Sequence, residues 1–443
     1  MFDVTGILLA LGVFALGLVA TSSTSFGHGR SNPGPFWIQS LVEVPIFILP
    51  GVVLTSLEGV RELWIFANIT ESDYRAAIFA IYYGLACYFV AVYTFDRVIR
   101  AFTRRPRMRP MPPRELRLLA RLLVVLQLLA LAAIALFVDR LPALGLLTGE
   151  DVGVLRRAAT IDFRGPTVLL SLVKLYGYLG LFLLAVMPGM PGMSGRRSLR
   201  TLLWLTSLCC MVWSGEKSPA VIGFLGYWFV RAHHERQPIT LRRLLPLAAA
   251  AIGLSAAMFA VVGGGDEFSA VEYVMIRAFL GQISGFFQTI GIFTPDPRYF
   301  QSWIPLAGSL SDQLPVFARD LMVMTEGDTD TSGTLNTLFL GEAYGAGGWP
   351  MLLLSPFIVA GSVVISLHLL RAVLTRYAGS EFATCGLFLF VMNSWLTSGM
   401  AGFPAFRGLI FVAFVLATVV VPYRLLRAIA RLPVRPAAAA AGR

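Results

Sequence analysis

Seven basic residues fall in segments between the most apolar runs of the chain, where they could hold an anion. A guanidinium presents parallel N–H groups to phosphate oxygens, and a lysine ammonium adds a compact positive charge. The sequence therefore predicts a phosphate or diphosphate site, with pairing to nearby acids or lipid phosphates as the alternative. The residues are Arg156, Arg157, Arg164, Lys217, Arg277, Arg298 and Arg319.

The stretch TSGTLNTLFLGEAYGAGGWP, residues 331–350, is small, polar and glycine-rich, and it leads directly into an apolar run. A carboxylate at the boundary between membrane and water can act as a general base on a sugar hydroxyl. Glu342 and Tyr344 are therefore predicted catalytic residues, together with Arg277. Asn336 is predicted to contact the substrate. The alternative is that this stretch only caps and packs the start of a helix.

Several other chemistries lack support. The chain has no Walker A motif and no dinucleotide-binding fingerprint, which argues against an ATP-driven pump. The acids of EGDTDTSG alternate as in a cation loop, but the later spacing of an EF-hand is missing, so no metal site and no cofactor are predicted. Three of the four histidines fall in expected cytoplasmic loops, and His368 falls near the cytoplasmic end of an expected span. An extracytoplasmic base must therefore be a carboxylate, a tyrosine or the substrate itself.

Composition indicates what must position these residues. Of 443 residues, 56% are hydrophobic and 14% are charged, whereas soluble domains carry about a quarter charged residues. About 20 apolar residues in a helix cross a bilayer, and lipid excludes unpaired backbone groups. The sequence therefore predicts an all-α polytopic integral membrane protein with a single transmembrane domain over residues 1–443. Eleven spans are expected near 4–22, 36–56, 76–95, 118–138, 167–187, 200–213, 220–231, 244–263, 349–369, 382–399 and 408–423.

The basic residues also orient these spans. Alternate loops hold 24 of the 36 lysines and arginines, and the opposite, much longer loops hold eleven. Positive residues concentrate on the cytoplasmic side, so the sequence predicts a bacterial inner-membrane protein with a periplasmic N-terminus and a cytoplasmic C-terminus. The net charge of +11 is then a topology signal, and no nucleic-acid partner is predicted. The first run lacks a basic n-region and is interpreted as a retained span rather than a signal peptide.

Two long periplasmic loops are expected, residues 139–166 with the arginine cluster and residues 265–348. An apolar stretch in the second loop, residues 272–293, would reverse the side of every later loop if it crossed the membrane. It is therefore predicted to be an interfacial or re-entrant helix. Residues 428–443 are predicted to form a disordered cytoplasmic tail.

Two charged residues, Lys174 and Glu43, fall inside expected spans. A charge in lipid is costly, so such a residue is either functional or extends its charged end to the interface. For Lys174, extension to the interface is the preferred interpretation, and for Glu43 both readings stay open.

Three local motifs add a family resemblance. VWSGEKSPAVIGFLGYWF (212–229) has a Ser/Thr-Gly-x-Arg/Lys turn that opens a span, LRRAATIDFRGP (155–166) is an arginine-bearing loop before a span, and LGEAYGAGGWPMLLL (340–354) has a Gly-x-x-Tyr-x-x-x-Gly pattern. In these motifs the chain resembles the bacterial O-antigen or oligosaccharide repeat-unit polymerases, membrane glycosyltransferases of the class C type. The likeness covers most of the chain in layout and about 45 residues in motif.

The resemblance implies a metal-independent transfer at the periplasmic face, in which a growing glycan passes from undecaprenyl diphosphate to the acceptor sugar of another lipid-linked unit. It implies membrane lipid, a chain-length regulator and a flippase as partners. The residues it implies as diphosphate ligands are Lys217, Arg157, Arg164 and Arg277.

Two alternatives stay open. The related O-antigen ligases typically carry a histidine in the large periplasmic loop, and its absence here favours a polymerase. A transporter or flippase of lipid-linked glycans would instead show inverted repeats and helices broken in mid-membrane.

Overall fold

The computed structural model describes most of the chain, and every regular element in the described part is helical. The predicted all-α class is therefore confirmed for this part. The described residues are 4–27, 33–66, 69–103, 110–143, 163–187, 197–240, 278–304, 316–326, 335–377, 379–400 and 406–431, with single residues at 145, 155, 159, 242, 246, 249, 253, 276 and 403.

Seven helical segments in the described part are long and apolar enough to cross a membrane. They correspond to the predicted first five, ninth and eleventh spans. The protein is therefore a multi-pass helical membrane protein. The segments are α1 (Val4–Ser22), Phe36–Leu54, α5 (Glu71–Phe102), α6 (Pro113–Ala135), α9 (Val168–Val186), α17 (Leu338–Tyr377) and Gly408–Ile429 of α19 (Arg407–Arg431).

The predicted sixth and seventh spans are present as helices, α10 (Arg197–Val212) and α11 (Lys217–His234). They are not among the seven long, apolar segments. The predicted eighth span, 244–263, lies almost entirely outside the described residues, as does most of the 139–166 loop. α19 continues to Arg431 and so corrects the start of the tail that was predicted to be disordered.

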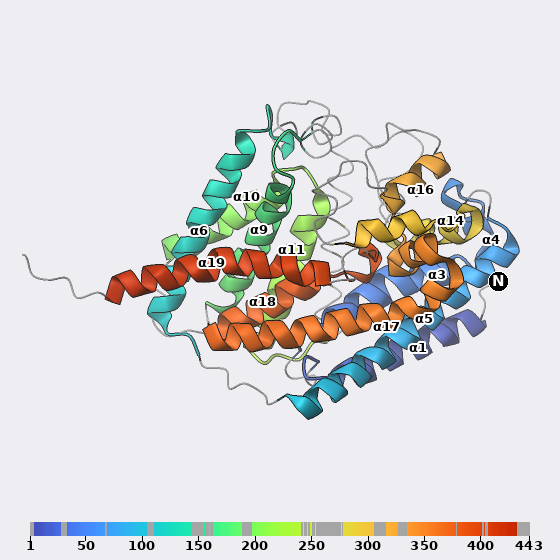
Figure 1. The fold of residues 1–443 in the computed structure, drawn as a ribbon, viewed down its shortest axis with the longest axis horizontal. Helices are drawn as coiled ribbons and strands as arrows, with labels where there is room; N and C mark the ends of the chain where they lie inside the picture. Colours follow the sequence, from blue (N-terminus) through green and yellow to red (C-terminus); the bar gives the residue numbers. More distant parts are fainter. Residues whose placement is uncertain are drawn as a thin grey trace, which may run out of the picture.

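The helices form two groups. α1, α5 and α17 lie side by side along one edge of the molecule, whereas α6, α9, α10 and α11 pack together on the other side (Figure 1). Small residues permit close approach in the second group. A Cβ on Gly180 of α9 would overlap Ser207 Oγ and Gln127 Nε2, which themselves form a hydrogen bond of 2.9 Å. Such packing of small and polar residues holds helices together where lipid supplies no hydrophobic drive.

The two ends of the bundle differ. We call the end where α5 and α17 begin the loop end, because α14 (Ser284–Ile292), η4 (Pro297–Trp303) and α16 (Phe317–Glu326) gather there (Figure 1). Gln288 of α14 donates to the carbonyl of Ile65 at 2.9 Å, just before α5. We call the opposite end the basic end, since the last turns of α5, α17 and α19 carry arginines there.

The segment predicted to be an interfacial or re-entrant helix forms η3 (Leu280–Gln282) and α14. α14 has nine residues, about 14 Å of helix, which is too short to cross a bilayer. Its residues from Ser284 to Ile290 are all buried, and it packs against α5 and α17. A helix covered on every side is not an amphipathic surface helix, so the interfacial interpretation is wrong for α14, and the re-entrant alternative stays a prediction.

Two spans depart from a regular α-helix. Residues Gln39–Ile48 form a π-helix, η1, that contains Pro45. The predicted tenth span, 382–399, is wrong as one helix: α18 (Ser380–Met392) stops at Met392, and a short 3-10 turn follows. The polar run NSWLTSG explains the stop, because its side chains and glycine do not favour a helix.

α17 begins at Leu338, well before the predicted start of the ninth span at residue 349. The backbone kinks at Gly347 and Gly348, where Gly348 adopts a φ of 65°. The predicted boundary therefore coincides with this kink. The residues before it form the first turns of α17 instead of a loop, and they carry Glu342 and Tyr344.

Candidate functional site

Glu342 lies on the first turns of α17 and contacts the chain just beyond α18. One carboxylate oxygen, Oε2, accepts the backbone N–H of Met400 at 2.6 Å. The preceding residue, Gly399, has a φ of +91°, and a Cβ at that position would overlap Glu342 Oε1. Both observations require glycine at position 399. The Glu342 carboxylate therefore occupies a space beside Gly399 that the side chain of any other residue at position 399 would fill. We call this space the notch.

A second carboxylate contacts the same stretch of chain, three residues earlier. Glu43 of η1 accepts the backbone N–H of Thr397 at 2.9 Å. One turn earlier, Gln39 donates to the carbonyl of Ser394 at 3.1 Å and accepts the hydroxyl of Tyr88 at 2.6 Å. The chain between α18 and Met400 is therefore held by side chains from η1.

We call residues 393–400 the linker, and the linker together with Gln39, Glu43 and Glu342 the linker cluster. In lipid, backbone without helical hydrogen bonds persists only where protein groups satisfy it. The three side chains supply acceptors and a donor to the linker backbone, which accounts for their polarity inside apolar spans. Gln39, Glu43 and Ser394 are buried, whereas Glu342 is partly exposed.

Glu43 is fully buried, and its second oxygen, Oε2, has no hydrogen-bond partner among the described residues. An unsatisfied buried acceptor costs about 1–3 kcal/mol. The sequence left open whether Glu43 extends its carboxylate to the interface. Because Glu43 is fully buried, it does not do so, and its carboxylate forms part of a polar site inside the protein. Glu342 differs, because it is accessible from outside the protein.

The other residues predicted on this stretch lie nearby. Asn336 donates to Gln282 Oε1 at 2.8 Å and so ties the start of α17 to η3. The ring of Tyr344 packs edge-on against Trp349, with centroids 5.7 Å apart. Asn336, Glu342 and Tyr344 therefore share the loop end of α17, two of them with partners on other elements.

The predicted diphosphate ligands lie on separate segments of the chain, unlike the residues of the linker cluster. Arg164 and Arg319 are exposed, on the segment before α9 and on α16. Lys217 begins α11. Among the described contacts, none joins Arg164, Arg298 and Arg319 into one cluster. The side chain of Lys217, and Arg156, Arg157 and Arg277, lie outside the described residues.

Arg298 has a local partner. Its guanidinium lies 2.6 Å from Asp296 Oδ2, and its backbone N–H donates to Asp296 Oδ1 at 2.9 Å. These contacts hold the pKa of the Asp296 carboxyl below its usual range. The next residue, Tyr299, donates to Asp320 at 2.8 Å; burial, and then Asp320, raise the pKa of its phenol. This part of η4 is therefore held by Asp296 at its N-terminus and by Asp320 of α16, and Arg298 stays 77% exposed.

Lys174 also finds an acid. Its ammonium pairs with Glu216, the residue that precedes α11 and Lys217. The preferred interpretation from the sequence, that Lys174 extends its ammonium to the interface, did not include this ion pair with Glu216. The pair joins α9 to the turn that carries the Ser-Gly-Glu-Lys motif, whose Gly215 has a φ of 69°.

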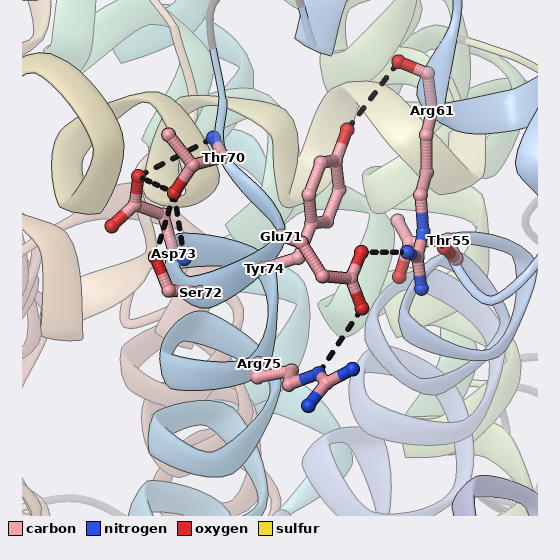
Figure 2. Close-up of polar contacts among 8 residues, drawn as sticks. All are labelled: Thr55, Arg61, Thr70, Glu71, Ser72, Asp73, Tyr74 and Arg75. Atoms are coloured by element: carbon pink, nitrogen blue, oxygen red, sulfur yellow. Dashed lines mark hydrogen bonds and ion pairs between the residues drawn. The ribbon is translucent and has the colours of Figure 1, made fainter.

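Two further basic residues of the loop end, Arg61 and Arg75, share one acid in the cluster that Figure 2 shows. Glu71 pairs with Arg61 and, at 3.1 Å, with Arg75. Arg61 also donates to the carbonyl of Thr55 at 2.6 Å, and Thr70 caps α5 through a reciprocal contact with Asp73. This cluster fixes the connection into α5 and leaves the linker cluster as the stronger functional candidate.

No protein-family model, curated protein or solved structure matches the chain. The fold and site therefore define a class only: a multi-pass helical membrane protein with a broken, carboxylate-lined segment reached from the loop end.

Sequence reasoning identified Glu342 and raised the question of Glu43, but it missed Gln39, Thr397, Gly399 and Met400. One signal was present. Gln39 and Glu43 lie four residues apart, which places two polar side chains on one helix face, and NSWLTSG interrupts an apolar run.

Proposed function

We propose that the protein is a glycosyltransferase that polymerises undecaprenyl-diphosphate-linked oligosaccharide repeat units at the periplasmic face of the bacterial inner membrane. The loop end would then face the periplasm. The observation that carries the proposal is the position of Glu342: a partly exposed carboxylate, fixed by Met400, at the loop end of a helix that also carries Tyr344 and follows Asn336.

In the proposed step, a hydroxyl oxygen of the acceptor sugar attacks the anomeric carbon of the donor glycan. A new glycosidic C–O bond forms as the bond between that carbon and the diphosphate oxygen breaks. The undecaprenyl diphosphate leaves with the bonding electron pair, and Glu342 accepts the hydroxyl proton. Asn336 and Tyr344 would position the acceptor.

The leaving diphosphate gains negative charge, which basic groups stabilise when they are already in place. Arg164, Lys217 and Arg319 are the described positions offered for this role. Arg298 would serve only by exchanging Asp296 for the substrate. Arg156, Arg157 and Arg277 complete the proposed set. A flippase would supply the lipid-linked units and a chain-length regulator would limit their number.

Glu342→Gln tests the proposal, because the amide keeps an acceptor for Met400 but cannot take a proton. We expect polymer formation to fall by about 100-fold or more, so that surface glycan in complemented deletion cells collapses to single repeat units on a gel. The matched control is Glu381→Gln. Glu381 also accepts a remote backbone N–H, that of Met111 at 2.7 Å, but at the basic end. Normal chain lengths with Glu342→Gln would sink the proposal.

A second function is favoured by one observation. Broken helices with polar groups inside the membrane are typical of transporters, and the linker, where the helix of the predicted tenth span stops, has this character. A flippase of lipid-linked glycans predicts that deletion removes surface glycan altogether. Loss of a polymerase leaves single units attached, and loss of an O-antigen ligase leaves long chains on the lipid carrier.

A further inference from the structure

A pocket of about 490 Å³ opens between α9, α10 and α11, in the helix group that does not contain the linker cluster. Its volume falls within the range of small-molecule sites, about 300–1,000 Å³. Each helix contributes one stripe of residues three or four positions apart, which is the spacing of a single helical face. The lining residues are Leu181 and Leu184 of α9, Arg197, Arg200, Thr201 and Trp204 of α10, and Phe224 and Tyr227 of α11.

The polarity of the pocket changes along α10. Arg197 and Arg200 lie in its first turn at the basic end, and Trp204 lies one turn deeper. At 1.5 Å per residue, Trp204 is about 10 Å along the helix from Arg197. Leu181 and Leu184 line the floor and are buried. The pocket therefore has two cations at its mouth and an apolar interior.

The charges at the mouth are both positive. No acidic residue lines the pocket among the described residues. Glu235, which directly follows α11, is paired with Arg231 at 2.9 Å. The first turn of a helix adds exposed N–H groups and a positive dipole end to the same place. The mouth therefore complements an anion.

The aromatic walls face outward. Trp204 is 41% exposed and Phe224 is 36% exposed, in helices of a membrane protein. An apolar interior open to the side and a cationic mouth together match a molecule with an anionic head and a hydrocarbon chain. Basic pockets between membrane helices recognise anionic lipid headgroups in this way.

We propose that this pocket binds an anionic phospholipid of the leaflet at the basic end. Arg197 and Arg200 contact its phosphate headgroup, and the first part of one acyl chain lies against Leu181, Trp204 and Phe224. This lipid is a component of the surrounding bilayer and is bound at the opposite end from the proposed transfer site.

Trp204 provides the test, because brominated acyl chains quench tryptophan on contact. The full-length protein and a Trp204→Phe variant are placed in nanodiscs with brominated phosphatidylglycerol or brominated phosphatidylcholine. The difference between the two proteins isolates Trp204 from the other tryptophans. We expect half-maximal quenching at about tenfold lower mole fraction of the anionic lipid, since each arginine near the surface strengthens such binding several-fold.

The double variant Arg197→Gln/Arg200→Gln should lose this preference. The matched control, Arg97→Gln/Arg376→Gln, removes the same charge from the basic-end turns of α5 and α17 and should keep it. Equal quenching by both lipids in the unaltered protein overturns charge recognition. Loss of the preference in the control as well shows general surface attraction, and absent quenching by either lipid shows that no acyl chain enters the pocket.

Discussion

The linker cluster and the basic end each contain a buried carboxylate that contacts a distant part of the chain. The two carboxylates differ in the groups that serve as their hydrogen-bond and ion-pair partners. At the basic end, Asp96 contacts Arg100 at 2.9 Å, His368 at 2.9 Å and the backbone N–H of Ser25 at 2.9 Å. In the linker cluster, Glu43 contacts the backbone N–H of Thr397 and has no ion pair among the described residues.

The difference follows from what each carboxylate joins. Asp96 links α5 to α17 through the side chain of His368, because the helical backbone of α17 forms its own hydrogen bonds there, and it also accepts the backbone N–H of Ser25, which follows α1. Glu43 and Glu342 face the linker, where the helix has stopped and backbone N–H groups have lost their helical acceptors. Asp96 therefore contacts the side chains of Arg100 and His368 as well as one backbone donor, whereas Glu43 and Glu342 each accept a backbone N–H of the linker.

Asp96→Asn gives the largest expected change. It removes the negative charge of a fully buried side chain that contacts Arg100 and His368. Breaking one side of a buried pair is strongly destabilising, so we expect a loss of about 3 kcal/mol in the free energy of unfolding. Denaturant titration of the purified protein in micelles measures it. A loss below that of Glu43→Gln would reverse the comparison.

Gly399→Ala tests the notch in the linker. The methyl group would overlap the Glu342 carboxylate, and the φ of +91° strains any other residue. We expect a loss of about 2 kcal/mol in the free energy of unfolding, together with loss of activity. Gly361→Ala in α17 is the control, since its added Cβ would meet Phe95 at an ordinary 3.5 Å. Equal effects of the two substitutions would show that the notch is not tight.

Glu43→Gln should have the smallest effect on stability. The amide oxygen still accepts from Thr397, and the new NH₂ group changes only the oxygen that lacks a partner. We expect a change of about 1 kcal/mol or less in the free energy of unfolding, in either direction. A loss as large as that of Asp96→Asn would mean that the charge of Glu43, rather than its hydrogen bond, holds the linker.

The sequence predicts those parts of the fold that depend on a local apolar run, and it does not predict those that depend on contacts between distant residues. The first span is predicted as 4–22 and found as Val4–Ser22, because a long apolar run is a local property. The prediction of one continuous helix over 382–399 is wrong. The mean hydropathy of this run is dominated by its apolar residues, so it does not reveal the polar residues after Met392. The start of α17 is also misplaced, since the polar residues before its kink are stabilised by contacts with α14 and the linker.

The candidate site was predictable only where one residue is unusual on its own. Glu342 is an acid in a small, glycine-rich stretch, and Glu43 is a charge in an apolar run. Their partners are not unusual: nothing local marks Met400 as a donor, and its contact with Glu342 spans 58 positions. Such pairings arise from the way helices pack, which residue spacing does not encode.

The contacts of the linker also have a consequence for the synthesis and membrane insertion of the chain. Gln39 and its partner Ser394 are separated by 355 positions, so the ribosome delivers the first long before the second. Until the chain has inserted as far as the linker, Gln39 and Glu43 remain without their backbone partners inside the bilayer. A chain truncated before residue 393 would therefore display unsatisfied polar groups within the membrane, a feature by which cellular quality control can distinguish an incomplete copy from a finished one.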